Sequence, residues 1–165
     1  MRKFSATLLI LALFAGSAEA HRDRILHVKA DGSIPDIPTK FGQARLIVEG
    51  LGSEKPLIQL RIGSHKTTLP LCVAQMIRTR TAAEIQVTGS WYHDEKTSLP
   101  YYLDVQFFDP GYDPKRSYNS SQEFLFNLHN AKLIDATAFK ATSAGDGGQR
   151  KALALPPGCK LDQDS

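Results

Sequence analysis

Apolar and polar residues alternate with a period of two along much of this chain, a pattern typical of half-buried β-strands. The segment 84–108 shows it most clearly, because one hairpin register around the loop 94–98 separates apolar from polar residues. The apolar pairs of that register are Ile85 with Phe107, Val87 with Val105, Gly89 with Leu103, and Trp91 with Tyr101. A slip of one residue would exchange the two faces, so the pattern predicts both this hairpin and its register.

Similar alternation predicts shorter strands on both sides of this hairpin. They are expected at 25–28, 44–49, 57–62, 65–69, 124–128 and 132–139. Gly63-Ser64 is a two-residue turn suited to a hairpin between 57–62 and 65–69. The stretch 31–38 contains two prolines and is predicted to be a loop.

The last of these hairpins leaves two registers open. Pairing Phe126 with Ile134 keeps Asp135 outside the core. Pairing Phe126 with Leu133 would instead bury Asp135 opposite Phe124.

One segment changes to a helical period. Leu69, Cys72, Val73, Met76 and Ile77 fall at positions i, i+3, i+4, i+7 and i+8, which form one apolar stripe on a helix. Pro70 suits the first turn of such a helix, where its missing N–H costs nothing. The spacing therefore predicts a helix over about Pro70–Thr79 that turns Cys72 inward.

Together these elements predict a mainly β fold: an antiparallel β-sandwich or curled sheet of about eight short strands, with one short helix near 70–79. The expected organisation is a signal peptide at 1–20, a single β-rich domain at 21–142, and an irregular C-terminal tail at 143–165. A disulfide is expected to tie that tail to the domain.

The first twenty residues have the order of features found in secretory signal peptides. Arg2 and Lys3 are followed by the apolar run 8–14 and by the small-x-small sequence Ala18-Glu19-Ala20. The run is too short for a membrane span, and no later segment approaches that length. We therefore expect an extracytoplasmic protein, periplasmic or secreted, cleaved between Ala20 and His21.

Charge and cysteine content fit that location. Cleavage would change the 20 basic and 17 acidic residues of the chain to 18 and 16, a net charge of +2 that gives no reason to expect a nucleic-acid partner. Cys72 and Cys159 both remain after cleavage. In an oxidising compartment they most simply form one disulfide, which would stabilise the fold by about 4–5 kcal/mol on the chain-entropy model.

His21 is a candidate metal ligand. With cleavage after Ala20, its free amine and imidazole could chelate copper, and a further imidazole from elsewhere in the chain would complete a three-nitrogen site. In this one residue the chain resembles copper-dependent polysaccharide monooxygenases and periplasmic copper carriers, and the resemblance ends there. The plainer interpretation is that 21–24 form a solvated terminus.

The end of the long hairpin is a candidate contact surface. Tyr92 and Tyr102 are predicted to face outward beside the loop that carries Asp94 and Lys96, and exposed tyrosines next to polar groups suit contacts with protein or glycan. The alternative is ordinary scatter of aromatic residues over a surface.

No nucleophile elbow, zinc-protease motif or nucleotide-binding glycine loop occurs in the sequence. The first hypothesis is therefore a non-catalytic binding or interaction protein of the inhibitor, protector or accessory type, without a cofactor and with a protein or glycan partner outside the cytoplasm. The alternatives are a copper-binding protein that uses His21 and a hydrolase whose catalytic triad is formed only in the fold.

Overall fold

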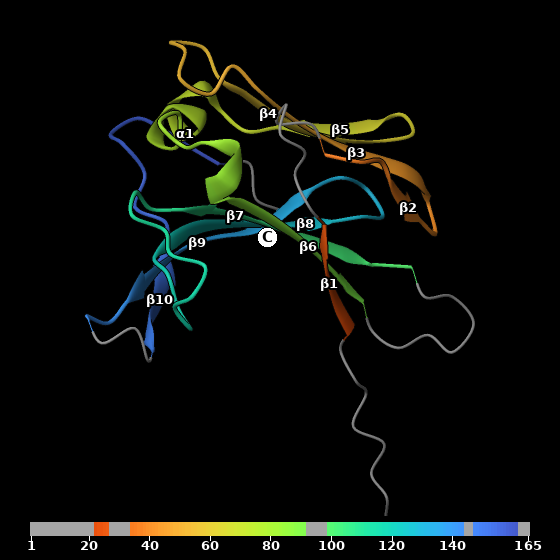
Figure 1. The fold of residues 1–165 in the computed structure, drawn as a ribbon. Coiled ribbons are helices and arrows are strands. Elements are labelled where there is room, and N and C mark those ends of the chain that lie inside the picture. The colour runs from red at the N-terminus through yellow and green to blue at the C-terminus, as the bar shows by residue number, and fades with distance from the viewer. Residues whose placement is uncertain (1–21, 27–33, 92–98, 144–146, 162–165) are drawn as a thin grey trace, which may run out of the picture.

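The protein consists of two antiparallel β-sheets packed face to face with one short helix, as the alternation predicted (Figure 1). The computed structural model describes residues 22–26, 34–91, 99–143 and 147–161, and it describes residues 22–26, 90 and 91 by their backbone alone. Ten strands are present in this part of the chain, two more than the approximate number expected.

The larger sheet has six strands in the order β1-β6-β7-β8-β9-β10. They are β1 (Arg22–Leu26), β6 (Ile85–Trp91), β7 (Tyr102–Phe108), β8 (Ser121–Asn127), β9 (Leu133–Ala141) and β10 (Gly148–Ala152). The predicted register of the β6–β7 hairpin is confirmed from the pair Ile85–Phe107 to the pair Ser90–Tyr102. At the end of β6, the backbone of Trp91 pairs with that of Arg22 in β1.

The smaller sheet has four strands in the order β2-β3-β4-β5. They are β2 (Ile37–Thr39), β3 (Gly42–Glu49), β4 (Leu57–Ile62) and β5 (His65–Thr68). The hairpin around Gly63, whose φ is +55°, is confirmed. The prediction of a loop at 31–38 is wrong at its C-terminal end, because Ile37 and Pro38 belong to β2. As β2 is an edge strand, Pro38 can lie in it without removing a hydrogen bond from the interior of the sheet.

Helix α1 (Leu71–Met76) confirms the helical stripe but is shorter than predicted. Pro70 is its N-cap, and Val73 and Ala74 are buried. The helix ends in a 3₁₀-type turn, in which the amide of Ile77 donates to the carbonyl of Ala74, three residues back. A separate 3₁₀ helix, η1 (Ala82–Glu84), leads into β6. None of the helices in the described ranges is long and apolar enough to cross a membrane.

The core lies between the two sheets and is closed at one end by α1. Its largest fully buried side chains come from both layers and from the helix end: Phe107, Phe124, Phe126, Ile58, Leu60, Ile62, Ile77, Leu103, Leu128, Leu133, Val73 and Val87. These residues include most of the inward-facing positions predicted in 57–62 and 124–128, together with Val87, Leu103 and Phe107 of the long hairpin; Val105 and Ile85 are also buried.

The β8–β9 hairpin combines the two registers that the sequence left open. From Ser121 to Leu125 the pairing follows the register that keeps Asp135 out of the core, so Asp135 lies opposite Leu125. A β-bulge then shifts the pairing, and Phe126 lies opposite Leu133. The extra residue, Ile134, is 37% exposed, so the bulge keeps the phenylalanines and Leu133 in the core at the cost of exposing one isoleucine.

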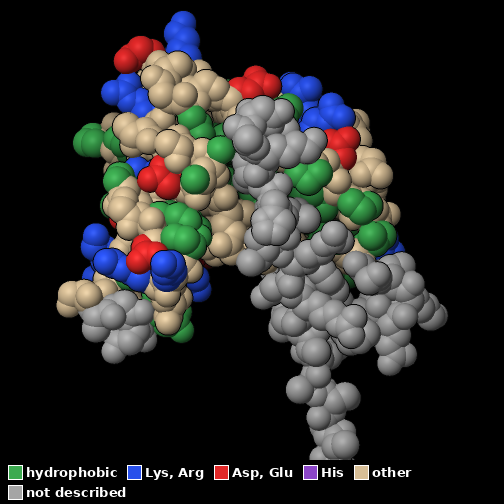
Figure 2. All heavy atoms as spheres, viewed as in Figure 1, with side chains coloured by type: hydrophobic (Ala, Val, Ile, Leu, Met, Phe, Trp, Pro, Cys, Tyr) green, Lys and Arg blue, Asp and Glu red, His purple; other side chains and the backbone are tan. Residues whose placement is uncertain are grey.

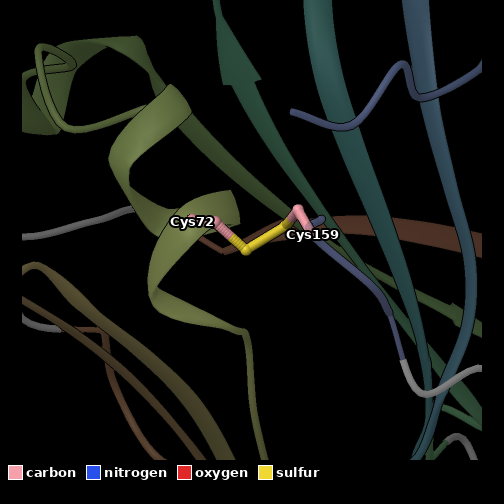
Figure 3. The surroundings of a disulfide bond; sticks show 2 residues. All are labelled: Cys72 and Cys159. Atoms are coloured by element: carbon pink, nitrogen blue, oxygen red, sulfur yellow. A yellow bond between two sulfur atoms is a disulfide. The ribbon is translucent and has the colours of Figure 1, made fainter. Parts of the chain in front are cut away.

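The C-terminal tail is only partly irregular, contrary to expectation. Residues 148–152 form β10, an edge strand paired with β9, whose five residues are all exposed and therefore show no apolar alternation. The predicted disulfide is confirmed: Cys159 is bonded to Cys72 of α1, with the two Cα atoms 6.0 Å apart (Figure 3). The tail thus crosses from the edge of the large sheet to the helix.

Candidate functional site

The outer face of the six-stranded sheet carries a row of polar and aromatic side chains. Residues that pair directly across antiparallel strands point to the same face. The pairing sets Phe108, Ser121, Phe139 and Arg150 in one row across β7 to β10. The row beside it consists of Gln86, Gln106, Glu123 and Thr137. Both rows point away from the core.

A groove of about 350 Å³ lies over these two rows, between the sheet and the loop 109–120. We call it the outer-face groove. It is lined by Gln86, Gln106, Phe108, Tyr112, Pro114, Arg116, Ser117, Tyr118, Asn119, Ser121, Glu123, Phe139 and Arg150. In the surface view, Lys and Arg side chains gather with hydrophobic and acidic ones at the end of the molecule where β9 and β10 lie (Figure 2).

Glu123 and Arg150 form an ion pair at the floor of the groove. Arg150 Nη2 lies 2.7 Å from Glu123 Oε2, and the glutamate side chain is only 10% exposed whereas the arginine side chain is 60% exposed. Glu123 also accepts hydrogen bonds from Ser121 Oγ (3.1 Å) and Thr137 Oγ1 (3.3 Å). A buried carboxylate is stable only with such partners. Glu123 is therefore an anchor, and Arg150 presents the exposed donors.

Phe139 supports Arg150 from the side. The guanidinium carbon of Arg150 lies 6.0 Å from the centre of the Phe139 ring, within range of a cation–π interaction. The ring itself lies against Gly148: a Cβ at that position would be 2.5 Å from Phe139 Cζ and 2.4 Å from the carbonyl oxygen of Lys140. Glycine at 148 is thus required for the close approach of the ring.

Tyr118 extends this aromatic surface from the loop. Its ring centre is 5.9 Å from that of Phe139, and the residue is 47% exposed. On the other side of the groove, Tyr112 stacks on Phe108 with ring centres 4.4 Å apart and planes 10° from parallel. The groove thus has an exposed ring and an exposed guanidinium, and both lie near the ring of Phe139.

The loop 109–120 is held in place at its base by a buried arginine. Arg80, 7% exposed, donates to Asp109 Oδ1 at 2.8 Å and to Gln122 Oε1 at 3.1 Å. Gln122 in turn donates to the same oxygen of Asp109 at 3.0 Å. Because Asp109 begins the loop and Gln122 follows its end, this network joins both ends of the loop to the turn before η1.

The loop is also tied across its middle. The side chain of Asn119 accepts from the amide of Asp113 (3.0 Å) and donates to the Asp113 carbonyl (2.9 Å). The amide of Asp109 donates to the carbonyl of Ser120 at 2.8 Å. These bonds give the loop a defined shape, so the groove walls are set before any ligand binds.

The residues predicted from the sequence as a contact surface are not at this groove. Tyr102 is half-buried at the start of β7 and lies on the outer face, opposite Asn127. The groove lies toward the other end of β7, where Gln106 and Phe108 are about 14 and 20 Å from Tyr102 at the usual strand rise. Tyr92, Asp94 and Lys96 lie outside the described residues, as does His21.

Sequence reasoning missed the groove residues. Alternation in a strand predicts which face of the sheet a polar residue lies on, but it does not predict which loop covers that face. Glu123 lies just before the predicted strand 124–128, and its adjacent position to Phe124 shows only that it faces the other side of the sheet. Arg150 lies in the segment expected to be irregular. The one usable signal was the pair of tyrosines, Tyr112 and Tyr118, in an otherwise polar loop.

Metal-binding side chains are scattered in the described part of the chain. No group of three or more His, Cys, Asp or Glu side chains in that part of the chain could hold a metal ion. The described ranges include two histidines. The ring centre of His129 lies 4.4 Å from that of Phe41, and His65 is exposed. Comparison with protein-family models, curated proteins and solved structures finds no match to this chain.

Proposed function

We propose that this protein is a non-catalytic, extracytoplasmic binding protein that takes up a glycan in the outer-face groove. The location is supported by the leader-like first twenty residues and by the disulfide, which is compatible with an oxidising compartment. The proposal rests chiefly on one observation: an exposed tyrosine and a fixed arginine both lie near the ring of Phe139 and line the same polar groove.

Sugar rings have one face of C–H groups and a rim of hydroxyls, and this groove matches both. Tyr118 over Phe139 provides an aromatic surface for the C–H face. Arg150 and the side-chain amides of Gln86 and Gln106 surround that surface with groups able to hydrogen-bond to hydroxyls. The volume of about 350 Å³ falls at the small end of the usual 300–1,000 Å³ of ligand pockets, enough for one or two sugar rings.

The test is glycan binding by the mature protein, measured by array screening and then by titration calorimetry. We expect Tyr118→Ala to weaken binding at least about fivefold, or about 1 kcal/mol, because it removes the exposed ring and leaves the strands intact. Leu71→Ala is a matched control, since Leu71 is also 47% exposed but lies on α1, outside the groove. An equal loss in both variants, or no binding to any glycan, would refute the proposal.

The same experiments distinguish the alternatives. Shortening of a bound oligosaccharide over time would favour the hydrolase hypothesis. Copper retained by the mature protein, and lost in a His21→Ala variant, would favour the copper-binding hypothesis. Capture of a protein partner that Tyr118→Ala releases would place a protein, not a glycan, in the groove.

A further inference from the structure

We infer that the glycan is acidic, with the carboxylate of a uronic acid bound by Arg150; this inference rests on the proposed function. Arg150 has five N–H donors in a planar fork, a geometry that matches a carboxylate. Arg150 contacts Glu123 through Nη2, and its side chain remains 60% exposed. A guanidinium fixed by a buried glutamate and a phenylalanine ring is already positioned for a ligand carboxylate.

The charges around the groove favour an anion. Arg116 and Arg150 line it, and Glu123 is the sole carboxylate among the described lining residues. The Glu123 carboxylate is covered by Ser121, Thr137 and Arg150, so it does not present its charge to a ligand. Arg116 is itself paired with Asp113, 3.7 Å away, so Arg150 provides the cationic donors best placed for a ligand anion.

A second groove, of about 520 Å³, continues this surface on the other side of the loop. Arg116 and Tyr118 line both grooves, and Lys140 lines the second one. The acidic residue of the second groove, Asp109, is paired with the buried Arg80 at 2.8 Å. A chain of several acidic sugars could thus pass over Tyr118 and meet a cation on each side of it.

The test compares each acidic sugar with an uncharged form of the same size. Tetramers of galacturonic acid and a hyaluronan tetrasaccharide are titrated against their fully methyl-esterified forms, and against a neutral galactose tetramer. We expect an acidic form to bind about tenfold or more tightly than its ester, because the ester cannot form the charge-assisted pair. The difference should shrink as salt is raised.

Variants identify the residue responsible. Arg150→Gln should remove the preference for the acid over the ester, whereas Lys151→Gln should retain it. Lys151 is a matched control because it is the next residue of β10 and faces the opposite side of the sheet. The double variant Glu123→Gln/Arg150→Gln covers the case in which Glu123, left unpaired, prevents folding.

The outcomes distinguish an error in the ligand class from an error in the proposed function. Acids, esters and the neutral tetramer could bind equally, with weaker binding in Tyr118→Ala. That result would overturn the inference that the ligand is acidic, and it would support the glycan-binding function. A preference for acids that survives in the folded double variant would also overturn it, since Arg150 would not be its source. No binding to any member of the set, nor to any glycan of the array, would refute the proposed function itself.

Discussion

Removal of the disulfide between Cys72 and Cys159 is the perturbation whose magnitude the structure defines best. The bond joins residues 87 positions apart, and it therefore closes most of the domain into one loop in the denatured chain. The chain-entropy relation gives about 4.6 kcal/mol of stabilisation for a loop of this length at room temperature. Native strain and residual structure in the denatured state lower that figure, so we expect a loss of about 3–4.5 kcal/mol.

The assay is urea denaturation of the wild type, of the wild type in reductant, and of the Cys72→Ala/Cys159→Ala double variant. The single tryptophan, Trp91, provides the fluorescence signal, and far-ultraviolet circular dichroism provides an independent one. Reduced wild type and the double variant should unfold at the same urea concentration, and reductant should not affect the variant. This comparison separates loss of the cross-link from loss of the two sulfur atoms in their partly buried positions.

A loss of less than about 1 kcal/mol in the double variant would refute the reasoning, because the cross-link would then be adding little to a tail already held by other contacts. Such contacts are present: Leu153, Leu155 and Leu161 pack partly buried against the core. The amide of Leu153 also donates to the carbonyl of Ala136 at 3.0 Å. Native-state hydrogen exchange of the amides in β10 would show whether these contacts suffice without the bond.

Three further predictions concern single positions. Gly148→Ala should destabilise the protein by about 1–3 kcal/mol and weaken glycan binding, since its Cβ would collide with a phenylalanine ring and a carbonyl, whereas Gly147→Ala, with open space around it, should do neither. Trp91→Ala should cost about 3–5 kcal/mol in urea denaturation if its predicted core-facing position is right, and Tyr102→Ala far less; equal losses would contradict the parity. Intact-mass measurement of the exported protein should give His21 as the first residue, and any other N-terminus would exclude the chelate proposed there.

The strands that the sequence predicted well are those with one face in the core. The register of the β6–β7 hairpin could be predicted because each strand has one apolar face, which must be buried, and one polar face, which must not. The same rule gave two answers for the β8–β9 hairpin, because Leu133 and Asp135 lie on the same face of a regular strand, so no single register buries the one and exposes the other. The bulge at Ile134 satisfies both demands, but a rule that assumes continuous pairing cannot propose it.

The elements that were missed are edge strands, and the reason is physical. β10 shows no alternation because all five of its residues are exposed, and β2 alternates over only three residues, too few to distinguish a strand from a loop. Pro38 in β2 and the five exposed residues of β10 are acceptable only in that position. Their sequences therefore resemble loops, and their place at the edges of the two sheets follows from tertiary pairing.

The candidate site could not be predicted from the sequence because it depends on one of those missed strands. Glu123 is buried on the outer face only because Arg150 of β10 neutralises it, and Phe139 takes its place only because Gly148 of β10 lets the ring approach. The groove is therefore complete only when the C-terminal segment is docked. Cys159 lies beyond β10 and fixes that segment to α1.

The disulfide should thus support binding as well as stability. If β10 opens more often in the Cys72→Ala/Cys159→Ala variant, the apparent affinity for glycan should fall by the fraction of molecules in which the strand is undocked. Ligand added in excess should then protect the amides of β10 from exchange in the variant more than in the wild type. A variant that binds as tightly as the wild type while its β10 amides exchange freely would show that β10 is not part of the site. It would also show that Arg150 does not bind the ligand.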